Sequence, residues 1–330
     1  MKDKIMKIRY KNNYSIEPNV FIFFYKELSK LKKNKNTLIR KIAAVGSLIF
    51  KRIAFSLVVS KRKMLVNAKI NGMMFRARST NSQFSSIYFD DYRNCYEPDI
   101  YGAVEKFLPN GGTMLDVGSN WGHHTFDAVV RKDANVFAFE PNVDVFNDLS
   151  RIISDLNFEH KVVPYKFGLG SETCDLTLTQ VGFESGVGSV DSSFVSQMVS
   201  ATNLLSKILD KLTFKKTILD SVKIKALDDF FDPKTAVDFI KMDCEGNELD
   251  ALKGASLLIK RDQPVIVFEL HTNKSCSNLS KYIDFFEPMG YQLFEIYTEV
   301  DSGIWHLKDI ENLFPYTQYN ILAKSKFKGK

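Results

Sequence analysis

The sequence is poor in several features that define whole classes of protein. Only four cysteines occur among 330 residues, and none stand in a CxxC pair. This argues against a zinc finger or a disulfide-stapled fold and favours reduced thiols in a cytosol-like compartment. No run of 18 apolar residues occurs, so a membrane-spanning helix is not expected. The first 30 residues lack a clean apolar segment and a small-residue cleavage site, which disfavours a cleaved signal peptide.

The charge of the chain is divided unevenly along its length. Residues 1–66 carry 17 Lys/Arg and 3 Asp/Glu, a net charge of +14, whereas the remainder carries −8. A basic front and an acidic body differ in composition enough to be separate units. We therefore place a boundary near residue 66, with a basic N-terminal extension over 1–66 and a second domain over 67–330. The apolar content of 45% is enough for a sizeable core.

The basic front contains one predicted helix, near residues 38–60. On a helical wheel, Arg40, Lys41, Lys51 and Arg52 fall within about 120° of one another, and the rest of the wheel is mostly apolar. Such a helix could pack its apolar face on the body and leave its cations in water. Alternatively, the cationic stripe suits the surface of an anionic membrane. A protein or nucleic-acid partner is a third interpretation.

From residue 67 onward, predicted strands alternate with predicted helices. A hairpin is expected at 69–76 and a hairpin arm at 174–179. The principal strands are expected at 113–117, 135–139, 161–167, 237–242, 264–270, 291–297 and 319–323. Helices are expected at 99–108, 123–131, 143–155, 247–259 and 278–288, and a further one near 194–212 within the poorly patterned stretch 182–221. This alternation is typical of a largely parallel sheet with helices on both faces, an α/β fold.

Acidic side chains follow the predicted strands. In a parallel sheet the carboxyl ends of the strands lie at one edge, where ligands bind. The residues at these ends are Asp116, Glu140, Asp243, Glu245, Glu269 and His271. A phosphate-bearing ligand would favour cations here. An acidic edge suits a ligand that carries hydroxyls or a positive centre.

The glycine turn after the strand at 113–117 tests the dinucleotide interpretation. The sequence fingerprint of dinucleotide-binding proteins needs glycines at positions 1, 3 and 6 of this turn. Counted from Gly118, the third and sixth positions are Asn120 and His123, so the NAD fingerprint fails. The acid at Glu140, 24 residues after Asp116, can accept the two hydroxyls of a ribose. S-adenosyl-L-methionine has a ribose, an ammonium and a sulfonium but no phosphate, so it matches this edge better.

Several motifs resemble a known family. The segment 116–122, DVGSNWG, resembles DVGANxG, the first motif of the FkbM-type methyltransferases, and Phe139-Glu140-Pro141 resembles the second. The segment 239–255, FIKMDCEGNELDALKGA, is very similar to the block most diagnostic of that family. Tyr96-Glu97-Pro98 and the segments 227–230 and 268–271 also resemble family positions. The resemblance covers roughly residues 90–325.

This resemblance implies a class I methyltransferase (Rossmann-like) fold, a seven-stranded sheet with an antiparallel last strand. It also implies S-adenosyl-L-methionine as methyl donor and, most often, O-methylation of a sugar or small metabolite. The residues expected at the cofactor are Glu97, Asp116, Gly118, Ser119, Asn120, Gly122, Glu140 and Pro141. Among them, Glu140 would bind the ribose, and Ser119 stands where the family usually has Ala.

The catalytic candidates are Asp243, Glu245 and His271. An alcohol that attacks a methyl group needs a base to take its proton. We hypothesise that His271 or Asp243 is that base and that Glu245 orients the acceptor. Each residue also has a structural interpretation: Asp243 as a helix cap, Glu245 as part of a tight turn, and His271 as a hydrogen-bonded core histidine. A divalent metal held by Asp243, Glu269 and His271 is a further alternative, and it is not favoured.

The leading function is therefore an S-adenosylmethionine-dependent O-methyltransferase that acts on a glycan or small-molecule acceptor in the cytoplasm, or peripherally at the inner membrane face. A catalytically silent protein of this fold, recruited to a membrane or partner by its basic front, is the alternative. Nucleic-acid methylation is disfavoured, because the [DNS]PP[YFW] tetrad of related folds is replaced here by Asp243-Cys244-Glu245-Gly246. A dehydrogenase is disfavoured further by the glycine spacing.

Overall fold

The computed structural model describes residues 65–78, 96–181, 217–272, 278–299, 302–310 and 318–327, together with Asn81, Gln83, Phe84, Ile87 and the backbone of strands at 6–7, 15–16 and 188–189. The helix expected at 38–60, with its proposed membrane role, and the helix expected at 194–212 lie outside these residues. No helix among the described residues is long and apolar enough to cross a membrane.

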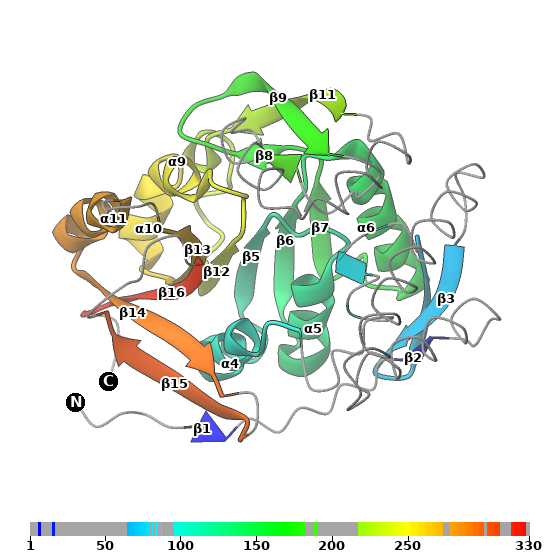
Figure 1. The fold of residues 1–330 in the computed structure, drawn as a ribbon, viewed down its shortest axis with the longest axis horizontal. Coiled ribbons are helices and arrows are strands. Elements are labelled where there is room, and N and C mark those ends of the chain that lie inside the picture. Colours follow the sequence, from blue (N-terminus) through cyan, green and yellow to red (C-terminus); the bar gives the residue numbers. More distant parts are fainter. Residues whose placement is uncertain are drawn as a thin grey trace, which may run out of the picture.

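A mixed sheet forms the centre of the protein (Figure 1). Among the described residues it has nine strands, in the order β1-β15-β14-β16-β13-β12-β5-β6-β7. Their bounds are β1 (Met6–Lys7), β5 (Thr113–Val117), β6 (Asn135–Phe139), β7 (Val162–Tyr165), β12 (Phe239–Met242), β13 (Val265–His271), β14 (Tyr291–Thr298), β15 (Ile304–Asp309) and β16 (Gln318–Ser325). The expected strands are all present, and β5 and β6 have the expected bounds.

The sheet is larger than the seven strands expected. From β7 to β13 the strands are parallel, β16 is antiparallel to both of its neighbours, and β14 lies beyond it. These seven strands contain one antiparallel strand, as expected, but β15 and β1 extend the edge beyond β14. The strand β15 was not predicted, because its sequence, IWHLKD, mixes apolar and charged residues without a clear alternation.

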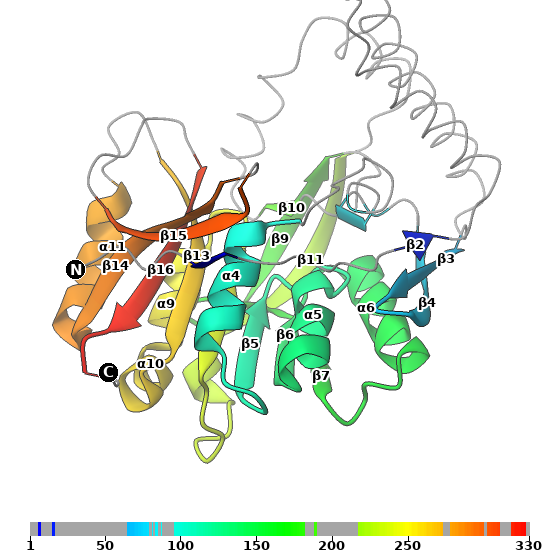
Figure 2. The same cartoon turned by 90° about the horizontal axis from the view of Figure 1, so that it is seen from below.

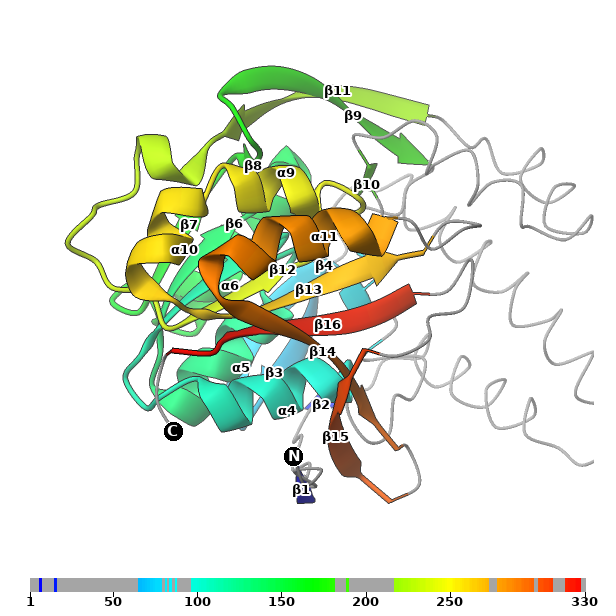
Figure 3. The same cartoon turned by 90° about the vertical axis from the view of Figure 1, so that its left-hand side faces the viewer.

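Helices cover both faces of the sheet (Figure 3). One face carries α4 (Pro98–Phe107), α5 (His123–Lys132) and α6 (Val143–Asp155), and the other carries α9 (Glu248–Lys253), α10 (Ser256–Asp262) and α11 (Asn278–Phe286). Two hydrophobic clusters fill the two layers, one with Trp121, Phe126 and Leu149, the other with Phe268, Leu252 and Phe286. The arrangement confirms the predicted α/β class.

The single helix expected at 247–259 is instead two helices. The break falls at Gly254, where a Cβ would lie 1.9 Å from the carbonyl oxygen of Gly170. The new helix α10 has its own cap: the carboxylate of Asp228 accepts hydrogen bonds from the backbone N–H groups of Leu257 (2.8 Å) and Leu258 (3.0 Å). The close backbone approach and the remote cap are both long-range contacts, which the helical spacing could not indicate.

Two small sheets flank the central one. The strands β8 (Gly168–Leu169), β9 (Cys174–Val181), β10 (Gly188–Ser189) and β11 (Thr217–Lys225) form an arm in which β9 pairs antiparallel with β11. Thus the predicted arm at 174–179 is present, but its partner β11, which begins within the poorly patterned stretch 182–221, was not predicted. The hairpin expected at 69–76 is formed by β3 (Leu65–Ile70) and β4 (Met73–Arg78), which lie beside α6 (Figure 2). The two-residue β2 (Ser15–Ile16) pairs with β3.

Candidate functional site

The glycine turn between β5 and α5 is built from backbone hydrogen bonds. The N–H groups of Gly118 and Ser119 both donate to the carbonyl oxygen of Phe139, each at 3.0 Å, and so tie the turn to the end of β6. The side-chain hydroxyl of Ser119 donates to the same oxygen at 3.3 Å. The turn then passes through Asn120 (φ 51°) and Gly122 (φ 97°), two left-handed positions that begin α5.

The turn after β5 lies directly against the turn after β12. A Cβ at Gly118 would lie 1.8 Å from the carbonyl oxygen of Asp243, and φ at Gly118 is 73°. A Cβ at Gly122 would lie 2.5 Å from the ring of Phe126. Both glycines are therefore required by close approach as well as by conformation, and the first of them brings two predicted site segments into contact.

Glu140 lies at the end of β6, beside this turn. One of its carboxylate oxygens accepts the backbone N–H of Asn120 at 3.0 Å, and the other accepts the N–H of Asn142 at 2.8 Å. Burial raises the pKa of Glu140 to about 7, even though the two N–H groups and the charge of Lys241 act to lower it. The next residue, Pro141, lies 3.6 Å from the position that a Cβ at Gly168 would occupy.

Lys241 is a site residue that the sequence did not single out as functional. Its ammonium lies 3.5 Å from a carboxylate oxygen of Asp116 and 3.6 Å from one of Asp243, and it donates a 3.0 Å hydrogen bond to the carbonyl oxygen of Gly118. Its side chain is only 2% exposed. Burial lowers the pKa of Lys241, but the charges of Asp116, Asp243 and Glu97 outweigh it and raise the pKa above its usual value. The available signal was a lysine inside an otherwise apolar buried strand.

Asp116 is buried at the base of the site. One oxygen of its carboxylate accepts a 2.6 Å hydrogen bond from the hydroxyl of Thr125 on α5, and the other faces Lys241. The side chain is 1% exposed. The acid that ends β5 is therefore held from two directions, by the helix that follows it and by the neighbouring strand.

The turn after β12 presents Asp243 and Glu245. It contains two consecutive left-handed residues, Glu245 (φ 53°) and Gly246 (φ 101°), and a carboxylate oxygen of Glu248 accepts the backbone N–H groups of Cys244 (2.8 Å) and Gly246 (3.2 Å). Burial first, with nearby acids, raises the pKa of Asp243 to about 7 and that of Glu245 to about 8. In the part of the chain that the structure describes, no backbone N–H donates to the carboxylate of Asp243 as it would to a helix cap, and Glu248 stabilises the turn instead.

His271 and Glu269 form a pair at the end of β13. The Nε2 atom of His271 lies 2.7 Å from a carboxylate oxygen of Glu269. Burial lowers the pKa of His271, but the hydrogen bond and charge of Glu269 raise it overall. Glu269 also raises the pKa values of Asp243 and Glu245, so these four side chains share one electrostatic environment. Among the described residues no group of three or more acidic, His or Cys side chains could hold a metal ion, so Asp243, Glu269 and His271 do not form such a group.

Glu97 precedes α4 and reaches the same region. It accepts a 2.6 Å hydrogen bond from the Nε2 atom of His124, which is 4% exposed. Burial raises the pKa of Glu97, but His124 and Lys241 bring it below its usual value. His123 and His124 are buried at the start of α5, and His124 is the hydrogen-bond partner of Glu97, a predicted site residue.

The sequence of the chain is similar to those of known methyltransferases. A family model described as the methyltransferase FkbM domain matches residues 116–293, just over half of the chain. A curated relative, the hexuronic acid methyltransferase AglP of Haloferax volcanii, is 28% identical over 223 residues, which cover 66% of this chain and 78% of that protein.

Solved structures also align with the chain. The methyltransferase FkbM of Methylobacillus flagellatus aligns at 15% identity and a TM-score of 0.38, over 87% of this chain and 58% of that one. TYW2 of Pyrococcus horikoshii, solved in complex with MeSAdo, aligns at 12% identity and a TM-score of 0.38, over 79% of this chain and 72% of that one. The family match covers both glycine-turn and acidic-turn segments of the site. This chain belongs to the FkbM methyltransferase family.

Proposed function

We propose that this protein is an S-adenosyl-L-methionine-dependent methyltransferase that methylates a hydroxyl oxygen of a sugar or another small hydroxylated metabolite. The observation that carries the proposal is the contact between two turns, in which Gly118 lies against Asp243. This contact puts the predicted cofactor residues beside the predicted catalytic ones. The curated relative acts on a hexuronic acid by its name, which makes sugars the first acceptors to test.

The residues around Glu140 fit the proposed cofactor. Each oxygen of this carboxylate holds one backbone N–H, so each can accept one further hydrogen bond, as two ribose hydroxyls would require. The only described cation hydrogen-bonded to the glycine turn, Lys241, is already engaged with Asp116 and Asp243, which suits a phosphate-free ligand with positive charge. When bound, S-adenosyl-L-methionine supplies a methyl group activated by its sulfonium.

The pKa values of the acidic residues suggest a different role for each. Asp243, with a pKa of about 7, is ionised in a large fraction of molecules at neutral pH and can take a proton from an acceptor hydroxyl. Glu245, with a pKa of about 8, is mostly protonated at pH 7 and can donate a hydrogen bond that orients the acceptor. The unprotonated form of His271 is less populated at neutral pH than in a free histidine, because its pairing with Glu269 raises the pKa of the ring. We therefore assign the base to Asp243.

A methyl-transfer assay tests this function. Purified protein is incubated with methyl-labelled S-adenosyl-L-methionine and a panel of neutral, amino and acidic sugars, and products are identified by mass spectrometry. Asp243→Asn should lower kcat by about 10²- to 10⁴-fold, the usual contribution of a general base, with a much smaller change in cofactor affinity. The matched control is Asp250→Asn on α9, an acid that is half exposed and pairs with Lys253. Unchanged turnover in Asp243→Asn, Glu245→Gln and His271→Ala alike would refute the assignment.

A further inference from the structure

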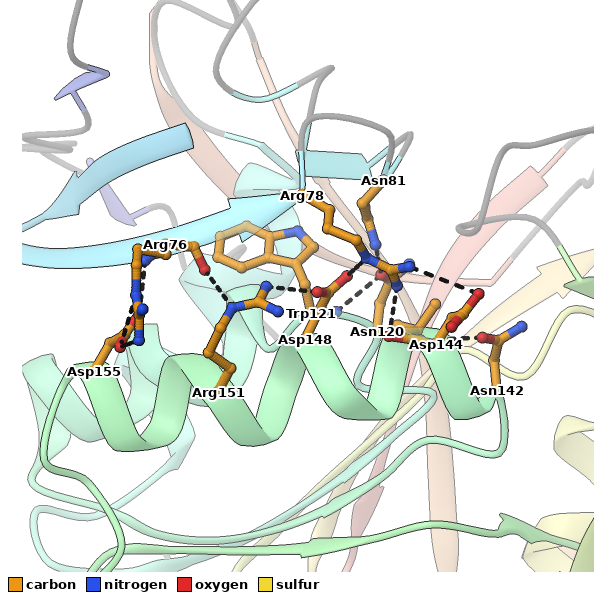
Figure 4. A network of polar contacts seen from close by, with 11 residues as sticks. Arg76, Arg78, Asn81, Asn120, Trp121, Asn142, Asp144, Asp148, Arg151 and Asp155 are labelled. Atoms are coloured by element: carbon orange, nitrogen blue, oxygen red, sulfur yellow. Dashed lines mark hydrogen bonds and ion pairs between the residues drawn. The ribbon is translucent and has the colours of Figure 1, made fainter. Parts of the chain in front are cut away.

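A segment outside the FkbM family match lies against the glycine turn. Asn81 follows β4 and is 1% exposed. Its side-chain amide donates a 2.7 Å hydrogen bond to the side-chain oxygen of Asn120, and its own side-chain oxygen accepts the backbone N–H of Phe84 at 2.9 Å. The same oxygen of Asn120 accepts the backbone N–H of Trp121 at 2.8 Å. The carboxamide of Asn120 is thus fixed between its own turn and a residue 39 positions earlier (Figure 4).

The segment that carries Asn81 is firmly held on α6 (Figure 4). The side chain of Arg78 lies 2.5 Å from the carboxylate of Asp148, which also accepts from Arg151 at 2.5 Å. Asp148 is 2% exposed. Nearer the hairpin turn, Arg76 lies 2.5 Å from Asp155 at the other end of the helix. Because the carboxylate of Asp148 is buried, its ion pair with Arg78 stabilises the position of β4 on α6 more than an exposed ion pair would.

Aromatic packing joins the same segment to the turn. The indole of Trp121 stacks on Phe75 of β4, with ring centroids 5.8 Å apart, and makes an edge contact with Phe84 at 5.5 Å. All three side chains are 2% exposed or less. Phe75, Asn81 and Phe84 therefore form the wall against which the glycine turn is packed.

These contacts close a ring around Glu140. The N–H of Asn81 donates to the carbonyl oxygen of Arg78, and the side chain of Asn81 holds Asn120. The N–H of Asn120 holds one oxygen of Glu140, and the N–H of Asn142 holds the other. Asn142 caps α6, and α6 holds Arg78. Each step is a hydrogen bond or ion pair, so Glu140 is oriented from both sides by one connected structure.

We propose that Asn81 is a positioning residue for cofactor binding, which fixes the left-handed turn at Asn120 and through it the carboxylate of Glu140. This inference rests on the proposed function, because it assigns that carboxylate to the ribose. Asn120 adopts φ 51°, a conformation that costs a non-glycine residue free energy unless its surroundings hold it. The hydrogen bond from Asn81 stabilises Asn120 in this conformation.

The sharpest perturbation is Asn81→Asp. It keeps the oxygen that accepts from Phe84 and replaces the donor to Asn120 by a second oxygen. We expect the dissociation constant for S-adenosylhomocysteine to rise about tenfold, the size of one hydrogen bond lost together with a repulsive oxygen pair. At saturating cofactor kcat should change little, because Asn81 touches neither acceptor nor base. If Asn81→Asp does not fold, Asn81→Ser keeps an oxygen near Phe84 and does not reach Asn120.

A coupling test separates this role from general support of the fold. Asn120→Gly tolerates the positive φ and removes the carboxamide. In that background Asn81→Asp should have little further effect on affinity. Arg76→Gln is the control, because it loosens the hairpin without touching the turn. The proposal is overturned if Asn81→Asp lowers cofactor affinity equally with and without the carboxamide of Asn120, or leaves affinity unchanged. It is also overturned if Arg76→Gln lowers affinity as much as Asn81→Asp does.

Hydrogen exchange of the ligand-free protein gives a readout that is independent of the cofactor. Peptides covering residues 116–124 should exchange faster in Asn81→Asp than in the wild type, while peptides from α6 stay protected. Exchange in 116–124 that matches the wild type would overturn the positioning role. If the wild-type protein binds neither S-adenosyl-L-methionine nor its demethylated product, the proposed function fails, and the exchange result still decides whether Asn81 holds the turn.

Discussion

Replacing Lys241 by Met tests whether the buried ammonium holds the site together. The change removes one positive charge and keeps a long apolar side chain. At an effective dielectric constant of about 20, each ammonium–carboxylate contact near 3.5 Å contributes about 4–5 kcal/mol. Burial of the three charges offsets much of this, and removing one partner of a buried pair costs about 3–5 kcal/mol in measured cases. We expect Lys241→Met to lower the free energy of unfolding by about that amount.

The matched control is Lys253→Met on α9. Its ammonium lies 2.9 Å from Asp250, closer than either contact of Lys241, but both side chains are half exposed, 51% and 50%. Exposed ion pairs contribute about 0–1 kcal/mol, so this variant should unfold almost as the wild type does. The comparison separates burial from distance as the source of the effect. Urea unfolding followed by circular dichroism at pH 7 measures the free energy of unfolding of both variants.

The cost of Lys241→Met should also depend on pH. Lys241 lowers the pKa of Asp243, so its loss raises that pKa further above about 7. As the pH falls below this value, the carboxyl group in the variant becomes neutral and no longer needs a counter-charge. The difference from the wild type should therefore be larger at pH 8 than at pH 5. The reasoning is refuted if Lys241→Met lowers the free energy of unfolding by less than about 1 kcal/mol, the loss expected for Lys253→Met. It is also refuted if the difference in unfolding free energy between Lys241→Met and the wild type is larger at pH 5 than at pH 8.

Three further predictions follow from the same geometry. Gly118→Ala should destabilise the protein far more than Gly111→Ala in urea unfolding, because φ is positive at both sites (73° and 71°) but only the first Cβ would meet a neighbouring atom. The pH profile of kcat should be bell-shaped, rising as Asp243 ionises near 7 and falling as Glu245 ionises near 8; a flat profile contradicts the assigned roles. Because the pKa of Glu140 is raised to about 7, its contribution to ligand-free stability is present below about pH 4.5 and is lost as the pH rises through 7. Melting temperatures should therefore fall less over this interval in Glu140→Gln than in the wild type, and equal falls would contradict the prediction.

Local sequence patterns predicted those parts of the fold that local interactions determine. The strands at Thr113–Val117 and Asn135–Phe139 have the expected bounds, because each is a short apolar run between turn residues. The helix Val143–Asp155 also has the expected bounds, since Asn142 caps it and its apolar residues recur at helical spacing. In each case the residues that define the element lie within a few positions of one another.

Contacts between distant segments could not be predicted in this way. The pairing of β9 with β11 joins strands separated by a long poorly patterned stretch, and the hydrogen bond from Asn81 to Asn120 joins segments whose sequences show no common pattern. Lys241 was visible as a lysine in an apolar strand, but its three partners come from β5, the glycine turn and the acidic turn. A single sequence does not contain the register that brings them together.

That register has a consequence for the chemistry. In the parallel pairing of β12 with β5, Lys241 lies opposite Asp116, and each strand ends one residue later, at Met242 and Val117. The ammonium then ties Gly118 to Asp243, and the missing Cβ lets the two turns touch. These contacts hold the two turns together, so we expect the cofactor side and the acceptor side of the site to keep a fixed relative position. A displacement at a methyl group needs its reacting atoms aligned closely, and misplacement by about 1 Å can cost 10²-fold in rate. Changes that separate these turns should therefore impair turnover even where both ligands still bind.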